Sequence, residues 1–403
     1  MTHVTPVSRR SFLGGAAALA AVAGAPAVAR AQGAPIRLGT LTPLTGAGGS
    51  YGPVMRKAME WVAGEVNAAG GVLGRRIELA SEDDQTNPEA AVRAARKLID
   101  VDKVAAVMGT WASAVTTAVA PLCWESKTFL TTVSGADSIT QLPHQGYLVR
   151  TQPNTHLQIG KLGEFLLTLR AKRVFVLSAQ TPYAVPSEKR LGEVLGKGGA
   201  TIVGHVVYDR EKATFRSEVD QALRAKPDMV FMNGYSPDVT IVLKEVFKAG
   251  YTGGKVAPAF AVNAKLLAGL PHEVTDGTYT WAPAPATESD AYKRLARALA
   301  TDDVDPYSAQ CHDHISLVTL AIAHAKGETT GTAVKDHVRR ISQGGGTKVE
   351  SAVEGLKLLA QGRAVNFEGA SGPCDFNEAG DILDCKFRYE QAEKGKFKLL
   401  RAT

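Results

Sequence analysis

The sequence predicts an α/β protein made of two lobes, each built on a doubly wound parallel sheet. From Ile36 onward, apolar runs of strand length alternate with amphipathic helical segments, and this order indicates parallel strands joined by crossover helices. The same alternation begins again near 154. The chain has 403 residues, which is too long for one ordinary domain and suits two.

The first unit alternates strand and helix as far as about 131. Its strands are predicted at 36–41, 77–79, 104–108 and 129–131. Apolar residues from Met55 to Val66 recur at spacings of three and four, which predicts a helix over 53–67 with one apolar stripe. A second helix begins at Asn87-Pro88, because Asn suits the N-cap and Pro suits the first helical position. A third helix is predicted from about Ser113.

The second unit repeats the pattern over about 154–281. Its strands are predicted at 173–177, 202–208 and 229–232. Its helices are predicted to begin near Leu157, Pro186, Thr214 and Ser236. Further helices are predicted near 288–300, 306–325, 332–342 and 349–361, and short strands within 364–403.

The first 31 residues have the pattern of a secretory signal peptide. Arg9 and Arg10 precede a run of mostly Ala, Val and Gly over 16–28, and Ala29-Arg30-Ala31 supplies small residues where a signal peptidase cleaves. The paired arginines resemble the twin-arginine signal, which exports folded proteins. A membrane anchor is the alternative, but the apolar run is short for a span of ~20 residues, and no cysteine near the cleavage site would carry a lipid. We therefore predict a periplasmic protein of 372 residues that begins after Ala31.

The charge of the chain does not favour a nucleic-acid partner. The formal net charge is +6, and loss of three signal-peptide arginines would bring it near +3. No block of Lys and Arg interleaved with aromatic residues occurs. We expect a monomer with a mixed, solvated surface.

The four cysteines permit one disulfide in an oxidising compartment. Cys374 and Cys385 flank Asn377-Glu378-Ala379-Gly380-Asp381, a sequence typical of a hairpin turn. Paired strands on either side of that turn would bring the two cysteines together, so we predict a Cys374–Cys385 disulfide. Cys123 lies on an apolar helical face and is expected to be a small buried side chain.

The loops that leave the carboxyl ends of the predicted strands are candidates for ligand binding. Open parallel sheets bind their ligands at this edge. Such loops occur at 42–52, at 109–113 and at 131–136. Ser113 begins a helix, so free backbone N–H groups and the positive end of the helix dipole lie beside its hydroxyl, which suits a carboxylate. The alternative is that Ser113 is a plain helix cap and the glycines are plain turns.

Several motifs, taken in their order and spacing, resemble the branched-chain amino-acid-binding protein family, the periplasmic receptors of amino-acid ABC transporters. The matching segments are 36–46, Tyr51-Gly52, 65–75, Asp83-Asp84, 87–91, 107–109 with Ser113, 230–235 and 369–380. Together they cover essentially all of 35–400.

This resemblance implies two lobes joined by three crossovers, with a ligand cleft between them and closure on the ligand. The first lobe would comprise 35–153 and about 282–370, and the second lobe 154–281 and about 371–403. The resemblance also implies a site. Its expected residues are Tyr51, Trp111, Ala112, Ser113, Ser134, Gly135, Ala136, Tyr183, Tyr235 and Phe260. Ser113 and the 134–136 loop would hold the ligand carboxylate, and the tyrosines would pack around the rest, although each tyrosine could instead be a half-buried surface residue.

One position departs from the amino-acid-binding members of that family. Those members use an acid on a second-lobe loop to neutralise the ligand ammonium, and Phe260 falls at that place here. No acid occurs between Lys255 and Pro271. Because burying an ammonium without a carboxylate is costly, we expect a ligand without an α-amino group. A carboxylate with an apolar or aromatic body, or a neutral amide, would suit the site.

Other classes of protein fit the sequence less well. A dinucleotide-dependent oxidoreductase would need its glycines directly after the first strand, whereas Thr42 to Thr45 separate that strand from 46–52. In Cys311-His312-Asp313-His314, at most Cys311 and His314 share a helix face, which is too few ligands for a closed zinc site. No catalytic, metal or cofactor role is therefore predicted. A ligand sensor for a membrane receptor remains an alternative to a transport role with permease subunits as partners.

Overall fold

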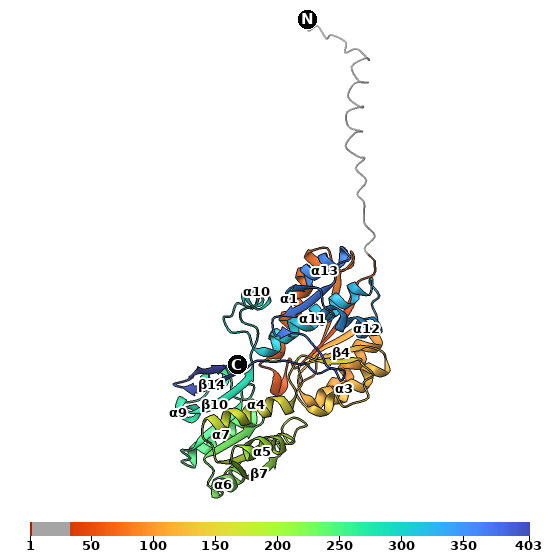
Figure 1. Ribbon diagram of the computed structural model, residues 1–403. Coiled ribbons are helices and arrows are strands. Elements are labelled where there is room, and N and C mark those ends of the chain that lie inside the picture. The colour runs from red at the N-terminus through yellow and green to blue at the C-terminus, as the bar shows by residue number, and fades with distance from the viewer. Residues whose placement is uncertain (2–32) are drawn as a thin grey trace.

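The computed structural model describes Met1 and residues 33–403. The predicted signal peptide and its cleavage site after Ala31 lie outside the described residues, apart from Met1. The chain forms two α/β lobes side by side, as predicted (Figure 1). No helix among the described residues is long and apolar enough to cross a membrane.

The first lobe is built on a five-stranded parallel sheet in the order β2-β1-β3-β4-β5. Its N-terminal elements are β1 (Ile36–Thr42), α1 (Gly52–Ala68), β2 (Ile77–Asp83), α2 (Pro88–Arg96), β3 (Ala106–Thr110), α3 (Ser113–Glu125), β4 (Phe129–Thr132) and β5 (Leu148–Arg150). Asn87 caps α2 by accepting from the backbone N–H groups of Glu89 and Ala90, which confirms the predicted helix start. The later segments add α10 (Asp290–Leu299), α11 (Pro306–His324), α12 (Gly331–Ser342), β11 (Thr347–Val349), α13 (Ala352–Ala360), β12 (Val365–Gly369) and β13 (Gly372–Pro373).

The second lobe is built on a seven-stranded sheet in the order β15-β14-β10-β9-β8-β6-β7. Its elements are α4 (Thr155–Thr168), β6 (Arg173–Ala179), α5 (Ser187–Lys197), β7 (Thr201–Tyr208), α6 (Arg216–Arg224), β8 (Met229–Asn233), α7 (Ser236–Lys248), β9 (Gly254–Pro258), α8 (Ala264–Ala268), α9 (His272–Thr275), β10 (Thr278–Pro283), β14 (Phe387–Glu393) and β15 (Lys396–Ala402). The strands from β7 to β10 are parallel, and β14 and β15 extend the edge antiparallel.

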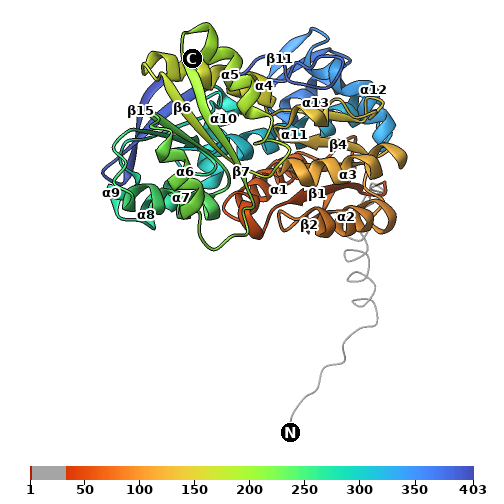
Figure 2. The ribbon, with the colours of Figure 1, turned by 90° about the horizontal axis from the view of Figure 1, so that it is seen from below.

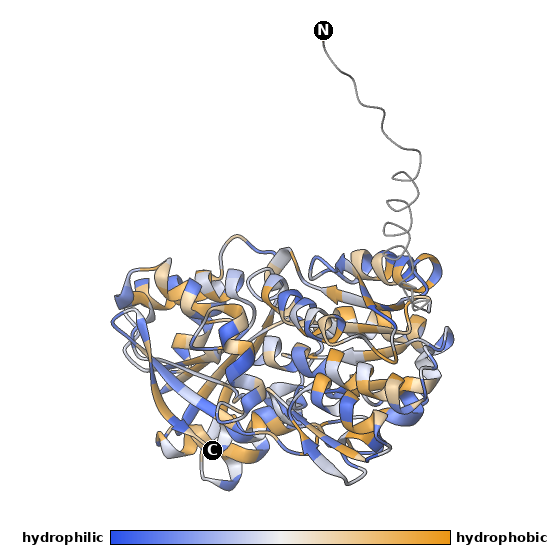
Figure 3. Cartoon of the chain, turned by 90° about the horizontal axis from the view of Figure 1, so that it is seen from above, coloured by the Kyte–Doolittle hydropathy of each residue, from blue (hydrophilic) through white to orange (hydrophobic). Residues whose placement is uncertain are grey.

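Helices cover both faces of each sheet, as expected for central strands such as β3 and β8, whose residues are all buried. In Figure 2, α2 and α3 lie on one side of the first sheet and α11, α12 and α13 on the other. Helix α11 is buried along almost its whole length because it packs against α1, α12 and α13 as well as β3. Figure 3 shows hydrophobic residues along the strands and mixed surfaces on the covering helices. A large core fills the first lobe beside a small cluster between α1, α10 and α11, and two cores lie on the two faces of the second sheet.

Within residues 33–403 the chain crosses between the lobes three times, after β5, after β10 and before β14. The third crossover lies later than about 371, where it was predicted. Cys374, Phe376 and Ile382 still belong to the first-lobe core, and β13 pairs with β12 of that lobe. The segment 371–382 therefore packs with the first lobe, because its apolar side chains are buried there.

The predicted Cys374–Cys385 disulfide is wrong, since both thiols are free. The hairpin forms as expected, with an antiparallel bridge between Phe376 and Ile382. Cys374, however, packs in the first-lobe core, whereas Cys385 lies beyond the hairpin against a core of the second lobe. The two cysteines therefore lie on opposite sides of the third crossover. Cys123 is fully buried, and burial raises the pKa of its thiol to about 12.

Candidate functional site

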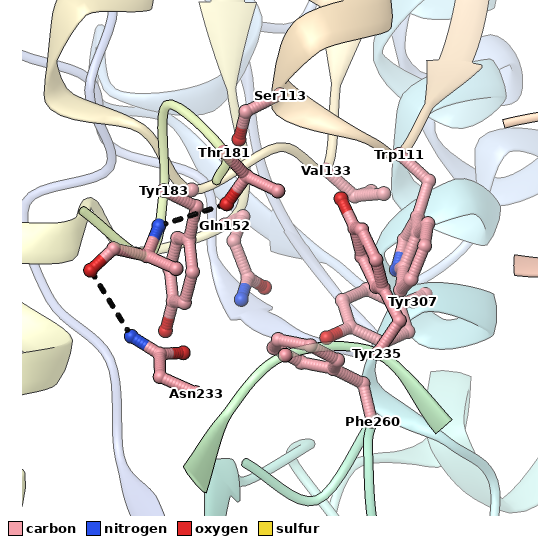
Figure 4. Close-up of a pocket in the computed structure, with 13 residues that line it drawn as sticks. Trp111, Ser113, Val133, Gln152, Thr181, Tyr183, Asn233, Tyr235, Phe260 and Tyr307 are labelled. Atoms are coloured by element: carbon pink, nitrogen blue, oxygen red, sulfur yellow. Dashed lines mark hydrogen bonds between the residues drawn. The ribbon is translucent and has the colours of Figure 1, made fainter. Parts of the chain in front are cut away.

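The carboxyl ends of the two sheets face each other across a narrow cavity between the lobes (Figure 4). In the first lobe the cavity lies beyond the ends of β3 and β4, and in the second lobe it lies where the strand order reverses, between β6 and β8. The lining residues are Trp111, Ser113, Val133, Gly135, Gln152, Thr181, Tyr183, Ala184, Asn233, Gly234, Tyr235, Phe260 and Tyr307.

The first-lobe wall contains the start of helix α3, at Ala112 and Ser113. Ala112 is the N-cap residue of α3 and has no side chain that could bond the first-turn N–H groups. Ser113 follows at the first helical position, and its hydroxyl oxygen accepts from the backbone N–H of Ala136 at 3.2 Å. The hydroxyl hydrogen of Ser113 therefore remains free to donate into the cavity. Unsatisfied N–H groups and the helix dipole make such a helix start favourable for an anion.

Aromatic rings from both lobes form one side of the cavity. Trp111 of the first lobe lies 5.4 Å from the ring of Tyr235 and 5.7 Å from that of Phe260, both in the second lobe. Tyr307, at the start of α11, meets Trp111 edge to face at 5.8 Å. These separations are typical of favourable aromatic pairs. The two lobes are thus in direct contact around the cavity.

Tyr183 closes the opposite side of the cavity in Figure 4. Its hydroxyl donates to Gln158 Oε1 at 3.3 Å, and its ring lies 5.8 Å from Phe260. The loop position facing Tyr183 must be glycine, because a Cβ on Gly135 would lie 2.8 Å from the tyrosine ring. Gly135 therefore allows the second-lobe ring to approach the backbone of the first-lobe loop.

Two buried amide side chains complete the wall. Gln152 lies on the first crossover, and its Oε1 accepts a hydrogen bond from Gln310 Nε2 at 2.8 Å. This bond does not use the NH₂ group of Gln152. Asn233, at the end of β8, is fully buried and donates from Nδ2 to the carbonyl of Ala184 at 3.4 Å. Its Oδ1 atom has no hydrogen-bond partner.

The cavity wall carries no formal charge. The lining residues include no Asp, Glu, Lys, Arg or His. Burial raises the pKa of Tyr235 to about 12 and raises the pKa values of Tyr183 and Tyr307 further above that of a free phenol. All three tyrosines are therefore neutral near pH 7, and the cavity is polar but uncharged.

Six of the ten site residues expected from the sequence line the cavity, and four lie just behind it. Ala136 donates its backbone N–H to Ser113 Oγ, and Ala112 is the N-cap residue of α3. Ser134 is fully buried, and its hydroxyl bonds Thr116 Oγ1 and the carbonyl of Trp111 instead of facing the cavity. These interactions stabilise the loop that carries Gly135 without contacting the cavity.

Tyr51 bridges the lobes behind the aromatic wall. Its ring stacks on Trp111 at 5.8 Å. Its hydroxyl lies 3.4 Å from the carbonyl of Phe260 and accepts from Asn263 Nδ2 at 3.1 Å. Tyr51 is therefore a first-lobe residue that bonds the second-lobe loop at 259–263. It does not line the cavity.

The cavity also contains residues that sequence reasoning missed. They are Val133, Gln152, Thr181, Ala184, Asn233, Gly234 and Tyr307. Thr181 and Ala184 belong to the same loop as Tyr183, so the rule that loops after strands bind ligands could have found them. Tyr307 follows the helix-starting Pro306, far along the chain from the other first-lobe residues, and no local pattern marks it.

A buried ion pair supports the ligand loop from behind. Arg150, at the end of β5, is fully buried and pairs with Asp381 of the third-crossover hairpin. Its guanidinium also donates to the carbonyls of Ala136 at 2.6 Å and Ser134 at 3.3 Å. Arg150 thus joins the first crossover, the third crossover and the loop beside Ser113.

The Cys311-His312-Asp313-His314 segment lies within α11 and has structural roles. Asp313 accepts from the backbone N–H groups of Ala370 and Ser371 at 2.8 Å each, and from His312 Nδ1 at 2.7 Å if that nitrogen is protonated. His314 Nε2 lies 2.8 Å from Thr151 Oγ1. The described residues contain no group of three or more His, Cys, Asp or Glu side chains that could hold a metal ion.

Residues 35–396 match a family model described as periplasmic binding protein. The chain belongs to the periplasmic binding protein family. Within it, the chain is a type I substrate-binding protein of the Leu/Ile/Val-binding group, which confirms the resemblance inferred from the sequence.

Individual relatives of this binding protein have different reported roles. A chemotactic signal transduction system substrate-binding protein of Halobacterium salinarum is 27% identical over 86% of this chain and 84% of its own. A leucine-binding protein of Thermotoga maritima has a TM-score of 0.77 at 21% identity, over 91% of this chain and 98% of its own. A solute-binding protein of R. palustris in complex with 4-hydroxybenzoate has a TM-score of 0.75 at 18% identity, over 92% of this chain and 97% of its own. At these identities the two structural likenesses concern the fold.

Proposed function

We propose that this protein is the periplasmic substrate-binding component of an ABC transporter, and that it binds an aromatic carboxylate without an α-amino group. It would act by lobe closure, as a non-catalytic monomer that delivers its ligand to membrane permease subunits. The observation that carries the choice of ligand is the uncharged, aromatic wall of the cavity.

The absence of an acid from the wall disfavours an α-amino acid. An ammonium enclosed between the lobes would lose its water and meet no carboxylate among the lining residues. Such burial costs several kcal/mol per unpaired ion. Phe260, which the family resemblance places where amino-acid-binding members have an ammonium-binding acid, points its ring into the cavity (Figure 4). The ligand expected here therefore lacks that charge.

A carboxylate suits the other end of the cavity. Ser113 has a free hydroxyl hydrogen, and the uncapped first turn of α3 provides backbone donors beside it. These neutral donors would hold an anion without a basic residue. Trp111, Tyr183 and Phe260 would then enclose a flat apolar body. Solved proteins of this fold include complexes with isoleucine and with 4-hydroxybenzoate, so the fold accommodates both classes and the wall chemistry favours the second.

The Ser113→Ala substitution tests the carboxylate end of this proposal. In calorimetry with 4-hydroxybenzoate, loss of a hydrogen bond to a charged group should weaken binding by ~1.5–3 kcal/mol, or roughly 10- to 150-fold in Kd. Ser217→Ala is the matched control, because Ser217 lies exposed on α6 outside the cavity, and it should leave the Kd unchanged. Equal affinities for wild type and Ser113→Ala would place the carboxylate elsewhere.

Sensing is a second candidate role, favoured by the chemotaxis-related relative. The two outputs separate in a strain that lacks the gene. Loss of labelled ligand uptake with normal chemotaxis would support transport. Loss of chemotaxis toward the ligand with normal uptake would support sensing.

A further inference from the structure

We infer that Asn233 selects ligands that carry a hydrogen-bond donor at the end opposite the carboxylate, such as the hydroxyl of 4-hydroxybenzoate. The inference rests on the proposed function and assigns this specificity to one atom, Asn233 Oδ1. Among the described residues that line the cavity, Asn233 is the one with a buried side-chain polar atom that lacks a hydrogen-bond partner. A buried acceptor left in this state destabilises the protein, and a ligand donor would satisfy it.

The orientation of the amide follows from its neighbour. Asn233 Nδ2 donates to the Ala184 carbonyl, which also accepts from Ser178 Oγ at 3.3 Å. A flipped amide would place two carbonyl oxygens against each other, so the hydrogen-bond network fixes Oδ1 on the cavity side. In Figure 4 the Asn233 oxygen points toward the cavity interior.

The polar groups of the cavity are arranged asymmetrically. Ser113 and Thr181 lie together at one end in Figure 4. Each hydroxyl accepts a backbone N–H, from Ala136 and Ala184 respectively, and so keeps its hydrogen to donate. Asn233 lies at the other end beside Phe260 and offers an acceptor. A carboxylate at the donor end and a hydroxyl at the acceptor end would match this pattern.

Because Asn233 is buried, it should discriminate strongly between ligands that carry a hydrogen-bond donor at this end and ligands that lack one. Asn233 has no exposed surface in this structure, so a ligand that packs against it without a donor would leave Oδ1 unpaired. Sites that hydrogen-bond a ligand hydroxyl discriminate strongly against analogues that lack it, because the site's own polar group stays unpaired. A ligand with an ether oxygen at this end should be disfavoured as well, since it would bring an acceptor against an acceptor.

The test measures Kd by calorimetry for benzoate, 4-hydroxybenzoate and 4-methoxybenzoate. Wild type should bind 4-hydroxybenzoate about tenfold or more tightly than benzoate, the ratio expected for one hydrogen bond. The methoxy compound should bind more weakly than the hydroxy compound. This ligand series tests the inference even if a variant fails to fold.

The Asn233→Leu variant, of similar size, should bind benzoate and 4-hydroxybenzoate with a ratio near one. Asn366→Leu is the matched control, because Asn366 Oδ1 is also buried without a partner but lies on β12 outside the cavity; its ratio should equal that of wild type. Equal wild-type affinity for benzoate and 4-hydroxybenzoate would overturn the role of Asn233 and leave the proposed function intact. No binding of any of the three compounds by wild type would overturn the proposed function and this inference with it.

Discussion

The Arg150→Met substitution would test how much the buried pair behind the ligand loop stabilises the protein. The exposed fractions of the two paired side chains are 0% for Arg150 and 14% for Asp381. Methionine fills a similar volume without charge or hydrogen-bond donors. The variant leaves the Asp381 carboxylate and the carbonyls of Ser134 and Ala136 without their guanidinium donor.

The expected loss follows from this burial. Removing one partner of a buried ion pair typically costs ~3–5 kcal/mol, because the other charge stays buried and unpaired. The free energy of unfolding, measured by urea denaturation at pH 7, should fall by about this amount. Ligand affinity should fall as well, since Arg150 holds the loop that carries Gly135.

A surface pair provides the matched control. Arg216 lies 3.9 Å from Asp220, and the two side chains are 79% and 50% exposed. Exposed pairs contribute ~0–1 kcal/mol, so Arg216→Met should change stability by no more than that. If Arg150→Met and Arg216→Met had equal effects, the reasoning about the crossover pair would be refuted.

Two further substitutions probe a buried acid of the first lobe and a contact between the lobes. Burial raises the pKa of Asp84 to about 7, so the folded protein binds the carboxyl proton more tightly than the unfolded chain does. The free energy of unfolding therefore falls as the pH rises from about 4 to about 7, by at most ~4 kcal/mol. Asp84→Asn removes that penalty, and in urea denaturation it should match wild type at pH 4 and exceed it at pH 8; an equal difference at both pH values would contradict this. Tyr51→Phe removes the hydroxyl that bonds the second-lobe loop, and calorimetry should show a ligand Kd about 3- to 10-fold weaker, whereas an unchanged Kd would mean that this bond does not stabilise closure.

Much of the fold was predictable because runs of apolar residues in the local sequence indicate which strands are buried. The apolar runs and the capping Asn87 are signals within one strand or one helix turn, and the structure confirms them. The failed disulfide shows the limit of such signals. The turn after Cys374 was predicted correctly, but the lobe against which each cysteine packs depends on long-range contacts that the spacing of two residues does not encode.

The candidate site divides in the same way. Ser113, Gly135 and Tyr183 occur in loops directly after strands, where the edge of a parallel sheet predicts ligand contacts. Tyr307 and Gln152 reach the cavity from a distant helix and a crossover, so only the folded arrangement brings them in. Tyr51 carried the right residue type in the right loop, yet it faces the other lobe behind Trp111.

The central claim is that the cavity accepts an aromatic carboxylate and rejects an ammonium. Calorimetry of the same protein preparation with 4-hydroxybenzoate and with leucine tests it most directly. We predict saturable binding of 4-hydroxybenzoate and no measurable binding of leucine. Tight binding of leucine without binding of 4-hydroxybenzoate would contradict the account.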